Sequence, residues 1–541
     1  MFSKYILTTT VALVLLKYQC YSADPSVSAQ FKKSAVCAGA NKCAEIGSST
    51  LNNGGSAVDA AIATMICNNL VHPHLAGYGG GFFMTVYDRA NKNVDFLNAR
   101  EKAPGDISKA SKTGVNSIAV PGEIAGYGVA HKKYGKLSWE KLFEPTIELC
   151  ESGYQISKAL AKAIASSADT IKQDDTLTAL YTNGGALKKE GDTVNPGKLC
   201  DTLKTIASGG ADEFYKGDLA SSIIGDLSKK SSALTKDDLS SYTAKWASPL
   251  KTTLLNDLTL YTANAPGGGA PLALALNIID EYGNDLVSSD AALKLHRLSE
   301  IWKYSVAAKS KLGDPDVSSL DELLKTITSD AYAKEIKSKI NDKETSHEAS
   351  HYGVDVDVQD EGTAQVSIID ADGNAVSATS SLNGVFGSGV VSESTGIILN
   401  SALSDFSPKS KANEIAPNKR PLSSMAPSII VDSNDNVKLV IGATGGAKIT
   451  TAVSSVLARY LWSKQGLKEA VDAPRLHQEI FPMELSYEES SDVITQLKEV
   501  YKHNTVEMKG ITSAICALSR EGDSILGVAD GRRGGSVQGS N

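Results

Sequence analysis

Thr363 is a candidate nucleophile because of its residue type and its position in this sequence. It follows Gly362 directly and opens a stretch that predicts a β-hairpin. From Val366 the residues are rich in β-branched side chains, Asp372-Gly373 is typical of a tight turn, and 375–381 predicts the returning strand. Thr363 is therefore expected at the mouth of a strand.

The peptide bond between Gly362 and Thr363 could be cut by the protein itself. Glycine permits a strained backbone and leaves its carbonyl open to the Thr363 hydroxyl, so an N-to-O acyl shift could cleave the chain there. Thr363 would then carry a free α-amine with a near-neutral pKa, able to act as general base for its own hydroxyl. The partner strand adds a run of small hydroxyl residues: Ser377, Thr379, Ser380 and Ser381. By residue type alone, a threonine beside a turn is more often only a strand former, so other motifs must decide.

Several further motifs together resemble the γ-glutamyltransferases (glutathione hydrolases), a family of N-terminal-nucleophile hydrolases. They are Gly362-Thr363-Ala364, the 372–380 stretch DGNAVSATS, Asn400, Ser404-Asp405-Phe406, the 420–425 stretch RPLSSM and the 442–446 stretch GATGG. The resemblance covers nearly the whole chain after its first thirty or so residues. It implies an α+β fold, the four-layer αββα sandwich. It also implies autocatalytic cleavage into a large subunit, 23–362, and a small subunit, 363–541, that stay together as a heterodimer.

The resemblance assigns the reacting groups. Thr363 would be the catalytic nucleophile that carries a γ-glutamyl ester, and Ser381 would assist processing and position it. Backbone N–H groups of Gly445 and Gly446 would form the oxyanion hole, because the absence of a side chain lets the peptide approach the oxygen closely. The implied reaction cleaves the γ-glutamyl bond of glutathione and related peptides, with an amino acid or water as acceptor. It needs no cofactor and no metal.

The resemblance also assigns a clamp for the α-amino and α-carboxyl ends of the glutamyl group. Arg100, Ser423 and Ser424 would bind the carboxylate, and a guanidinium suits this task because it can bind both oxygens. Asn383 and Asp405 would bind the ammonium group. Without the resemblance, the serine pair would more often be turn chemistry.

Of four departures from the family pattern, three leave a second function open, and the fourth, at Ser381, is mild because serine keeps the hydroxyl. Gln365 stands where the family usually has His, Ser381 where it has Thr, Ala402 where relatives place Glu or Gln, and Val385 where animal relatives have an aromatic residue. Losing one charge-assisted hydrogen bond costs about 1.5 to 3 kcal/mol. The alternative is a secreted, catalytically impaired homologue that acts by binding a ligand or partner. A third option, a β-lactam acylase of the same superfamily, is disfavoured by the amino-acid clamp.

Length and composition favour a soluble protein of two domains or one large layered unit. The chain has 541 residues, of which 42% are apolar and 21% charged. Its formal net charge of −8 provides no basic surface, so nucleic acid is not an expected partner.

The first residues have the pattern of a secretory signal peptide, residues 1–22. Lys4 supplies a positive charge, 5–16 is mostly apolar, and small residues precede a cleavage position after Ser22. The apolar run is too short to span a membrane. We therefore expect a secreted, extracellular protein without a stable membrane anchor.

The cysteine count agrees with an oxidising compartment. Of the seven cysteines, Cys20 lies in the signal peptide, and an even number remains: Cys37, Cys43, Cys67, Cys150, Cys200 and Cys516. The resemblance pairs Cys43 with Cys67. Spacing alone leaves the other pairings open.

The elements that must position the site can be predicted in part. Ser56 is a plausible N-cap of an apolar helix that ends near His72-Pro73-His74, where two histidines without further ligands do not predict a metal site. Strands are predicted over 82–87 and 94–97, the second leading to Arg100. Neither the 77–81 glycines nor 445–448 has the spacing of a nucleotide-binding loop.

Two long charged stretches, 157–240 and 291–340, have helical spacing and are expected to cover the outside of the sheet. The polar stretch 341–359 lacks a sustained period, and we expect it to be a mobile tether that leads to Thr363.

Overall fold

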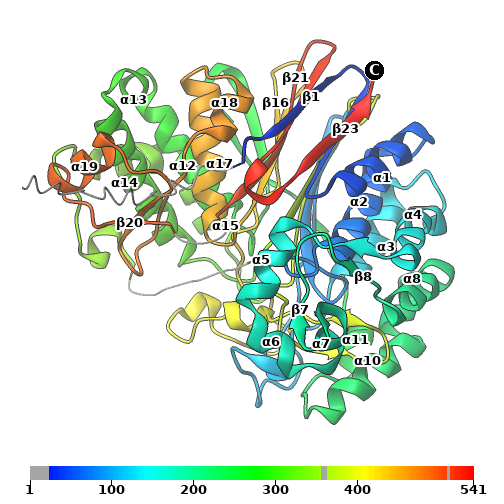
Figure 1. Cartoon of the computed structure of the whole chain (residues 1–541). Helices are drawn as coiled ribbons and strands as arrows, with labels where there is room; N and C mark the ends of the chain where they lie inside the picture. The colour runs from blue at the N-terminus through cyan, green and yellow to red at the C-terminus, as the bar shows by residue number, and fades with distance from the viewer. Residues whose placement is uncertain (1–23, 355–361, 509–511) are drawn as a thin grey trace, which may run out of the picture.

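Two seven-stranded sheets stack face to face at the centre of the computed structural model, with helices on both outer sides (Figure 1). The structure describes residues 24–354, 362–508 and 512–541. The predicted signal peptide, residues 1–22, therefore lies outside the described residues. Within the described ranges, no helix is both long and apolar enough to cross a membrane.

The sheet that carries Thr363 is built from antiparallel pairs around the predicted hairpin. In spatial order it comprises β23 (Ser536–Ser540), β2 (Ser34–Ala38), β12 (Ala364–Ile369), β13 (Ala375–Ser381), β3 (Gly81–Asp88), β4 (Asn93–Ala99) and β9 (Lys245–Ala247). β12 and β13 lie at its centre, joined by the predicted turn, in which Gly373 has a φ of +83°. The hairpin prediction is confirmed.

The second sheet is also antiparallel. In spatial order it comprises β1 (Val27–Phe31), β22 (Ser524–Ala529), β21 (Ala514–Glu521), β17 (Val437–Thr444), β16 (Ser428–Val431), β11 (Leu258–Thr262) and β10 (Leu250–Leu254). Both sheets contain strands from before and after Thr363. The two predicted subunits are therefore interleaved within each sheet.

The facing surfaces of the sheets are apolar, with a few polar links. Ile369 and Ala375 of one sheet belong to the same buried cluster as Ile429 and Val440 of the other. The hydroxyl of Ser377 donates to the carbonyl of Ile441 at 3.1 Å. Burial of two inner faces on each other requires helices on the outer faces, which completes four layers.

One outer layer packs on the Thr363 sheet and includes the predicted helix. It consists of α1 (Asn41–Asn52), α2 (Ala57–Val71) and α3 (Glu123–Tyr134), and α4 (Trp139–Ser152) packs on α2. Ser56 caps α2 as predicted, since its side chain accepts from the N–H of Asp59 at 3.0 Å and the Asp59 carboxylate accepts from the Ser56 N–H at 2.9 Å.

The other outer layer packs on the second sheet through α12 (Gly269–Tyr282) and α17 (Lys448–Leu457), and α14 (Ala291–Lys309) packs on α12. The predicted four-layer αββα sandwich is thereby confirmed.

The charged helical stretches form helices, but many of these pack on other helices rather than on a sheet. They include α5 (Lys158–Ser166), α6 (Ala168–Gln173), α7 (Asp175–Tyr181), α8 (Lys198–Gly209), α10 (Asp218–Lys229), α11 (Lys236–Ser241), α15 (Asp321–Ile327) and α16 (Asp330–Lys339). α8 packs on α4 and α16 on α12. They form a further shell, beyond the layer that covers each sheet.

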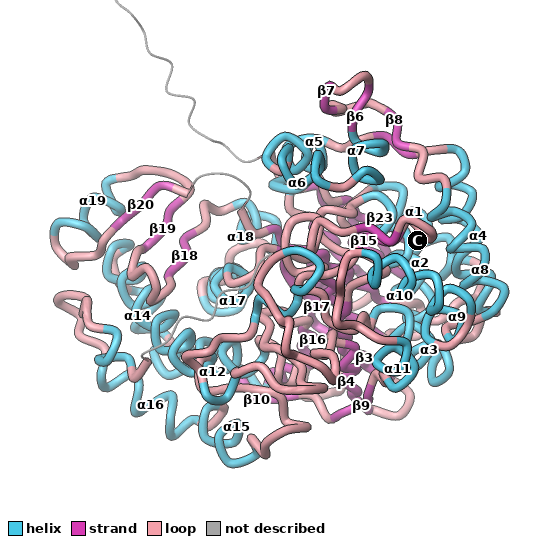
Figure 2. The backbone as a smooth tube through the Cα atoms, turned by 90° about the horizontal axis from the view of Figure 1, so that it is seen from below, coloured by secondary structure: helices cyan, strands magenta, loops and turns pink. Residues whose placement is uncertain are grey.

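A small third sheet stands apart from the two central ones (Figure 2). It contains β18 (Leu476–Gln478), β19 (Leu485–Tyr487) and β20 (Thr505–Glu507), beside α19 (Asp492–Glu499) and α14. Sequence analysis did not predict it.

Three disulfides connect separate elements. The Cys43–Cys67 pair, predicted from the family resemblance, is confirmed and joins α1 to α2. Cys150–Cys200 joins α4 to α8. Cys37–Cys516 joins β2 of one sheet to β21 of the other.

The stretch before Thr363 was predicted to be a mobile tether, and this prediction is wrong for its described part, 341–354. It contains η3 (Ala349–Tyr352), and Tyr352 is buried with its hydroxyl donating to Glu300 of α14 at 2.8 Å. This part is held to the helical layer by a buried contact that its polar composition does not reveal. Residues 355–359, for which the tether was also predicted, lie outside the described residues.

Candidate functional site

Thr363 lies fully buried directly before β12. Its Oγ1 accepts a 2.8 Å hydrogen bond from the N–H of Gly445. The sequence analysis places both residues in the site, and the structure brings them into direct contact across 82 residues of sequence.

The carbonyl group of Gly362 is held beside that hydroxyl. The Ser381 hydroxyl donates to the Gly362 oxygen at 2.7 Å, and Ser381 Oγ accepts from the N–H of Asn383 at 2.8 Å. Gly362 has a φ of +53°, and a Cβ at this position would lie 2.3 Å from the backbone carbonyl oxygen of Asn383. Only glycine fits there without strain, and its carbonyl is already polarised by a hydroxyl donor.

Gly445 and Gly446 lie between the end of β17 and the start of α17. Their φ values are +115° and +59°, and a Cβ on Gly445 would lie 2.9 Å from the Cα of Ser513. The N–H groups near a helix N-terminus favour negative charge. An amide that already reaches Thr363 from this position is well placed to donate to an oxyanion formed there.

Arg100 follows β4, as predicted, and forms a buried ion pair. Its Nη2 donates to the carboxylate of Asp405, and the two side chains are 0% and 3% exposed. Its Nη1 donates to Glu101 at 3.1 Å, and Nη2 also reaches the carbonyl of Leu422 at 3.2 Å. Leu422 directly precedes Ser423, so the guanidinium lies beside the serine pair.

A polar pocket of about 1020 Å³ is lined by Asn383 and Asp405. Asn383 adopts a φ of +73°, and its Nδ2 donates to the hydroxyl of Ser404 at 2.7 Å. Its Oδ1 is buried and has no hydrogen-bond partner among the described residues. A carboxylate and an amide oxygen without a described partner, both from residues that line the pocket, suit an ammonium ligand.

The serine pair contacts a residue that the sequence analysis missed. Ser424 Oγ accepts a 2.5 Å hydrogen bond from Nζ of Lys309, at the end of α14. Lys309 is 6% exposed, and no ion pair of 4 Å or less joins it to another described residue. A buried ammonium beside the expected carboxylate clamp adds positive charge where a substrate anion would bind. The sequence offers no signal for it, because Lys309 is one lysine among many in a charged helical stretch.

Two of the four departures lie away from the pocket. Ala402 is fully buried in an apolar cluster with Ala103, Ala119 and Phe406. Gln365 is buried within the hairpin, where its Nε2 donates to Ser377 at 2.9 Å. Neither residue lines the pocket that contains Asn383 and Asp405.

The other two departures remain at the site. Val385 lines the polar pocket, and Ser381 keeps the hydroxyl that contacts Gly362. The serine substitution therefore preserves the hydrogen bond that the site uses.

Glu123 is a second residue that the sequence analysis did not select. It is buried behind β13, where the Ser380 hydroxyl donates to its carboxylate at 3.0 Å and the Tyr127 hydroxyl at 2.5 Å. Burial raises the pKa of Glu123 to about 7, although hydrogen bonds from Tyr127, Asn69 and Ser380 act in the opposite direction. Glu123 therefore holds Ser380, the neighbour of Ser381 in β13, and contacts the site through this strand.

The histidines that sequence analysis considered for a metal are deeply buried. Burial lowers the pKa of His72 to about 4 and holds the pKa of His74 well below its usual range. Their rings lie edge to face, with centroids 5.8 Å apart. Neutral, enclosed rings of this kind belong to the packing beneath the hairpin.

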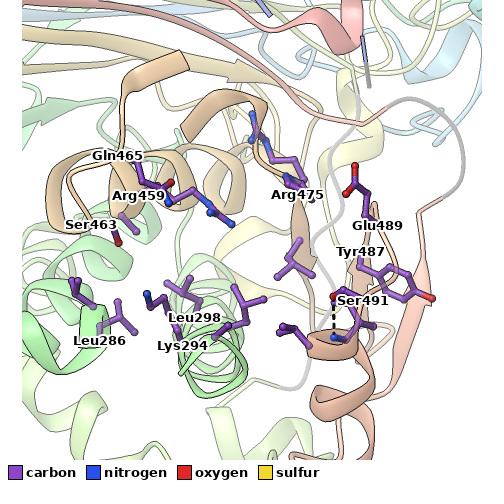
Figure 3. A pocket seen from close by; sticks show the side chains of 18 of the residues that line it. Leu286, Lys294, Leu298, Arg459, Ser463, Gln465, Arg475, Tyr487, Glu489 and Ser491 are labelled. Atoms are coloured by element: carbon purple, nitrogen blue, oxygen red, sulfur yellow. Dashed lines mark hydrogen bonds between the residues drawn. The ribbon is translucent and has the colours of Figure 1, made fainter. Parts of the chain in front are cut away.

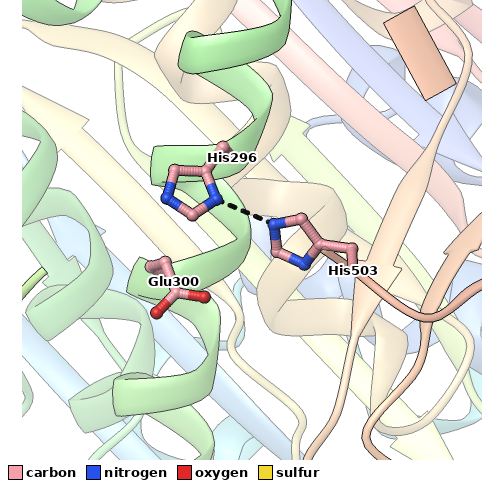
Figure 4. A group of neighbouring side chains, drawn as sticks. All are labelled: His296, Glu300 and His503. Carbon is pink, nitrogen blue, oxygen red and sulfur yellow. Dashed lines mark hydrogen bonds between the residues drawn. The ribbon is translucent and has the colours of Figure 1, made fainter. Parts of the chain in front are cut away.

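A separate group has metal-ligand residue types: His296, Glu300 and His503 (Figure 4). Its ligand atoms lie within 4.8 Å of one another. His296 Nδ1 and His503 Nε2 share a 2.8 Å hydrogen bond, and the Glu300 carboxylate accepts from Lys303 Nζ at 3.1 Å. The buried Lys303 ammonium already balances the carboxylate, so a closed hydrogen-bond network explains the group.

Comparisons with known proteins agree over almost the full chain. A family model described as gamma-glutamyltranspeptidase matches residues 43–540. Scoloptoxin SSD14 from Scolopendra dehaani is 39% identical over 545 residues, with 96% of this chain and 94% of the relative covered. Glutathione hydrolase 2 from Arabidopsis thaliana is 34% identical over 559 residues, with 99% and 96% covered.

A solved cephalosporin acylase from Bacillus halodurans superposes with a TM-score of 0.85 at 24% identity, covering 98% of this chain and all of that one. At this identity the likeness shows the fold alone. It agrees with the sandwich of two sheets described above.

Proposed function

The chain belongs to the gamma-glutamyltranspeptidase family and is an enzyme of the glutathione hydrolase kind; we propose that it cuts itself before Thr363 and then cleaves γ-glutamyl bonds through an ester on that residue. The contact of Thr363 Oγ1 with the Gly445 N–H, beside a Gly362 carbonyl held by Ser381, carries this proposal. The substrates are glutathione and related γ-glutamyl peptides, and the acceptor is an amino acid or water.

The self-cleavage step begins at the scissile carbonyl. Thr363 Oγ attacks the carbonyl carbon of Gly362, the C–N bond breaks, and the hydroxyl proton is transferred to the departing nitrogen, which becomes the free α-amine. Water then hydrolyses the ester, releasing a carboxylate on Gly362 and the Thr363 hydroxyl. The hydrogen bond from Ser381 to the Gly362 oxygen supports this step, because it stabilises the negative charge that develops there.

The same residue would then perform turnover. The Thr363 amine accepts the hydroxyl proton as Oγ attacks the γ-carbonyl carbon of the substrate, and the tetrahedral oxyanion is bound by the N–H groups of Gly445 and Gly446. The amine returns the proton to the leaving nitrogen. Water or an amino acid amine finally attacks the ester and regenerates Thr363.

The clamp would bind both ends of the glutamyl α-carbon. Arg100, Ser423 and Ser424 take the carboxylate, assisted by Lys309, while Asp405 and Asn383 take the ammonium. Support comes from the Arg100–Asp405 pair, from the buried Asn383 Oδ1 that lacks a partner among the described residues, and from the buried Lys309 ammonium. An amino-acid head is favoured over a β-lactam by this pairing of opposite charges.

The mature protein would be a secreted heterodimer of 23–362 and 363–541. The signal-peptide pattern and the three disulfides support secretion. Each central sheet contains hydrogen-bonded strands from both proposed subunits, which supports stable association after the cut.

Release of p-nitroaniline from γ-glutamyl-p-nitroanilide by the purified protein tests the function. We expect turnover by the cut wild-type protein and none by Thr363→Ala, which should remain one uncut, folded chain. N-terminal sequencing should show a fragment that begins at Thr363. A wild-type protein that cuts itself but releases no chromophore would instead support the impaired homologue, and normal cutting of Thr363→Ala would refute the shared role of its hydroxyl.

A further inference from the structure

A second pocket lies away from Thr363, beside the small third sheet (Figure 3). Its volume is about 310 Å³, within the range of small-molecule sites. It is enclosed by α14, by the turn that follows α17 and by β18, β19 and the start of α19. It shares no lining residue with the pocket that contains Asn383 and Asp405.

Most of the pocket wall is aliphatic. Leu298 and Leu476 form part of it, Leu286 and Val287 contribute from α13 (Asn284–Ser288), and Ile494 contributes from α19. Water in such a space would find few hydrogen-bond partners, so an apolar ligand would gain free energy by displacing it.

Two cations interrupt this apolar wall at one end. Arg459 and Lys294 lie on the same side of the pocket, and Glu489 lies at the opposite end (Figure 3). Both cationic side chains are half-buried, and neither forms a hydrogen bond or ion pair with any residue that the structure describes. Burial lowers the pKa of Arg459, and Glu469, which is exposed, acts in the opposite direction. A partly desolvated guanidinium that forms no ion pair with a described residue would be stabilised by an anion.

The backbone and neighbouring polar groups add to this arrangement. Arg459 belongs to η6 (Ala458–Trp462), a π-helical turn, and such turns occur frequently at functional sites. Arg475 also lines the pocket, and although its Nη2 donates to Asp530 at 2.8 Å, its buried Nε has no partner among the described residues. The same holds for Oε1 of Gln465. Unsatisfied polar atoms beside two unpaired cations indicate a site built for a polar end group.

We propose that this pocket binds an apolar molecule that carries one carboxylate, with the carboxylate at Arg459 and Lys294 and the apolar part against Leu298 and Leu476. The site is separate from the hydrolase centre and does not depend on its activity. A neutral apolar molecule would leave both cations unpaired, and a small polar anion would leave the aliphatic wall exposed to water.

Isothermal titration with decanoate, decan-1-ol and acetate tests both parts of the proposal. The uncut Thr363→Ala protein is used beside the wild type, so that binding at the hydrolase centre is distinguishable. We expect decanoate to bind both proteins with a negative heat-capacity change, and decanol and acetate to bind at least tenfold more weakly. Equal affinity for decanoate and decanol, or no binding of decanoate at millimolar concentration, would overturn the proposal.

Matched variants locate the ligand. Arg459→Gln and Lys294→Met should each weaken decanoate binding, about ten- to hundredfold for the guanidinium, while leaving decanol binding unchanged. Lys498→Met removes an exposed charge of α19 that does not line the pocket, and it should bind decanoate normally. Val287→Trp should block both decanoate and decanol by filling the half-buried edge of the pocket. Equal losses in Arg459→Gln and Lys498→Met would show that only net charge matters and that the assigned site is wrong.

Discussion

Arg100 and Asp405 form a buried ion pair, although they lie 305 residues apart and were assigned to opposite ends of one ligand. The group proposed to bind a substrate carboxylate therefore neutralises the group proposed to bind its ammonium. A zwitterion can replace this pair without leaving either buried charge uncompensated. A ligand with a single charge can pair with only one of them, and Arg100 has a second buried partner, Glu101.

Substrate analogues should reveal this requirement. Acylating the α-amine of γ-glutamyl-p-nitroanilide, or converting its α-carboxylate to an amide, should each raise the KM at least tenfold, because one charge-assisted hydrogen bond is worth about 1.5 to 3 kcal/mol. Initial rates over a substrate series measure both effects. An analogue that keeps its KM after losing either charge would show that this end of the substrate is not held.

Ser381→Ala should slow self-cleavage at least tenfold. The variant loses the hydroxyl that donates to the Gly362 oxygen, and loss of one such donor commonly costs a hundredfold or more in rate. The time course of cutting on reducing gels measures the effect. Ser367→Ala is the matched control, since this buried hydroxyl on β12 donates instead to the Cys516 carbonyl at 2.9 Å. Comparable delays in both variants would indicate general disturbance of the sheets.

Gly362→Ala should stop or strongly delay the cut while the protein still folds. The added Cβ would lie 2.3 Å from the backbone carbonyl oxygen of Asn383, and a φ of +53° disfavours alanine. The scissile carbonyl of residue 362 must therefore move. Gly54→Ala is the control, because Gly54 also has a positive φ, +88°, but a Cβ there meets nothing within 4 Å. Normal cutting of Gly362→Ala would mean that the carbonyl position is not critical.

Lys309→Met should raise the KM for γ-glutamyl substrates about ten- to hundredfold, with a smaller change in kcat, because a buried charge that favours the carboxylate is lost. Lys309→Arg should restore part of the affinity. Steady-state kinetics of both variants provide the measurement, with Lys311→Met, an exposed neighbour, as control. A fall in kcat without a change in KM would place Lys309 in positioning Thr363 rather than in the clamp.

Glu123→Gln should change how stability depends on pH. The pKa of Glu123 is raised from 4.5 to about 7, so in wild type its contribution is fully present below pH 4.5 and is lost as pH rises to about 7. At about 1.36 kcal/mol per pKa unit, this difference corresponds to roughly 3 kcal/mol. Urea unfolding of both proteins across pH 4.5 to 7.5 should show a smaller loss in the variant. Glu140→Gln, at an exposed position, should follow wild type; an identical slope in Glu123→Gln would contradict the raised pKa.

Local patterns explain what could be predicted from the sequence. The β12–β13 hairpin follows from β-branched residues around a two-residue turn, and the start of α2 from a capping serine. The sandwich and the placement of Thr363 beside Gly445 followed from a family resemblance, since no local pattern joins segments 82 residues apart.

Tertiary packing determines what could not be predicted. Lys309 and Glu123 acquire their importance from burial beside other elements, and neither has a distinctive neighbourhood in sequence. The same cause explains the error over 341–354, where Tyr352 enters a buried network despite its polar surroundings. Ala402 shows the converse, because a substitution that suggests lost binding in sequence lies in an apolar cluster.

If the chain is cut before Thr363 as proposed, the Cys37–Cys516 disulfide links the two resulting pieces. Cys37 then belongs to the large piece and Cys516 to the small one, so the two pieces remain one covalent molecule. Their association is intramolecular, and its equilibrium is independent of protein concentration. Dilution in an extracellular fluid would not separate them, and after partial unfolding each piece would still find its own partner.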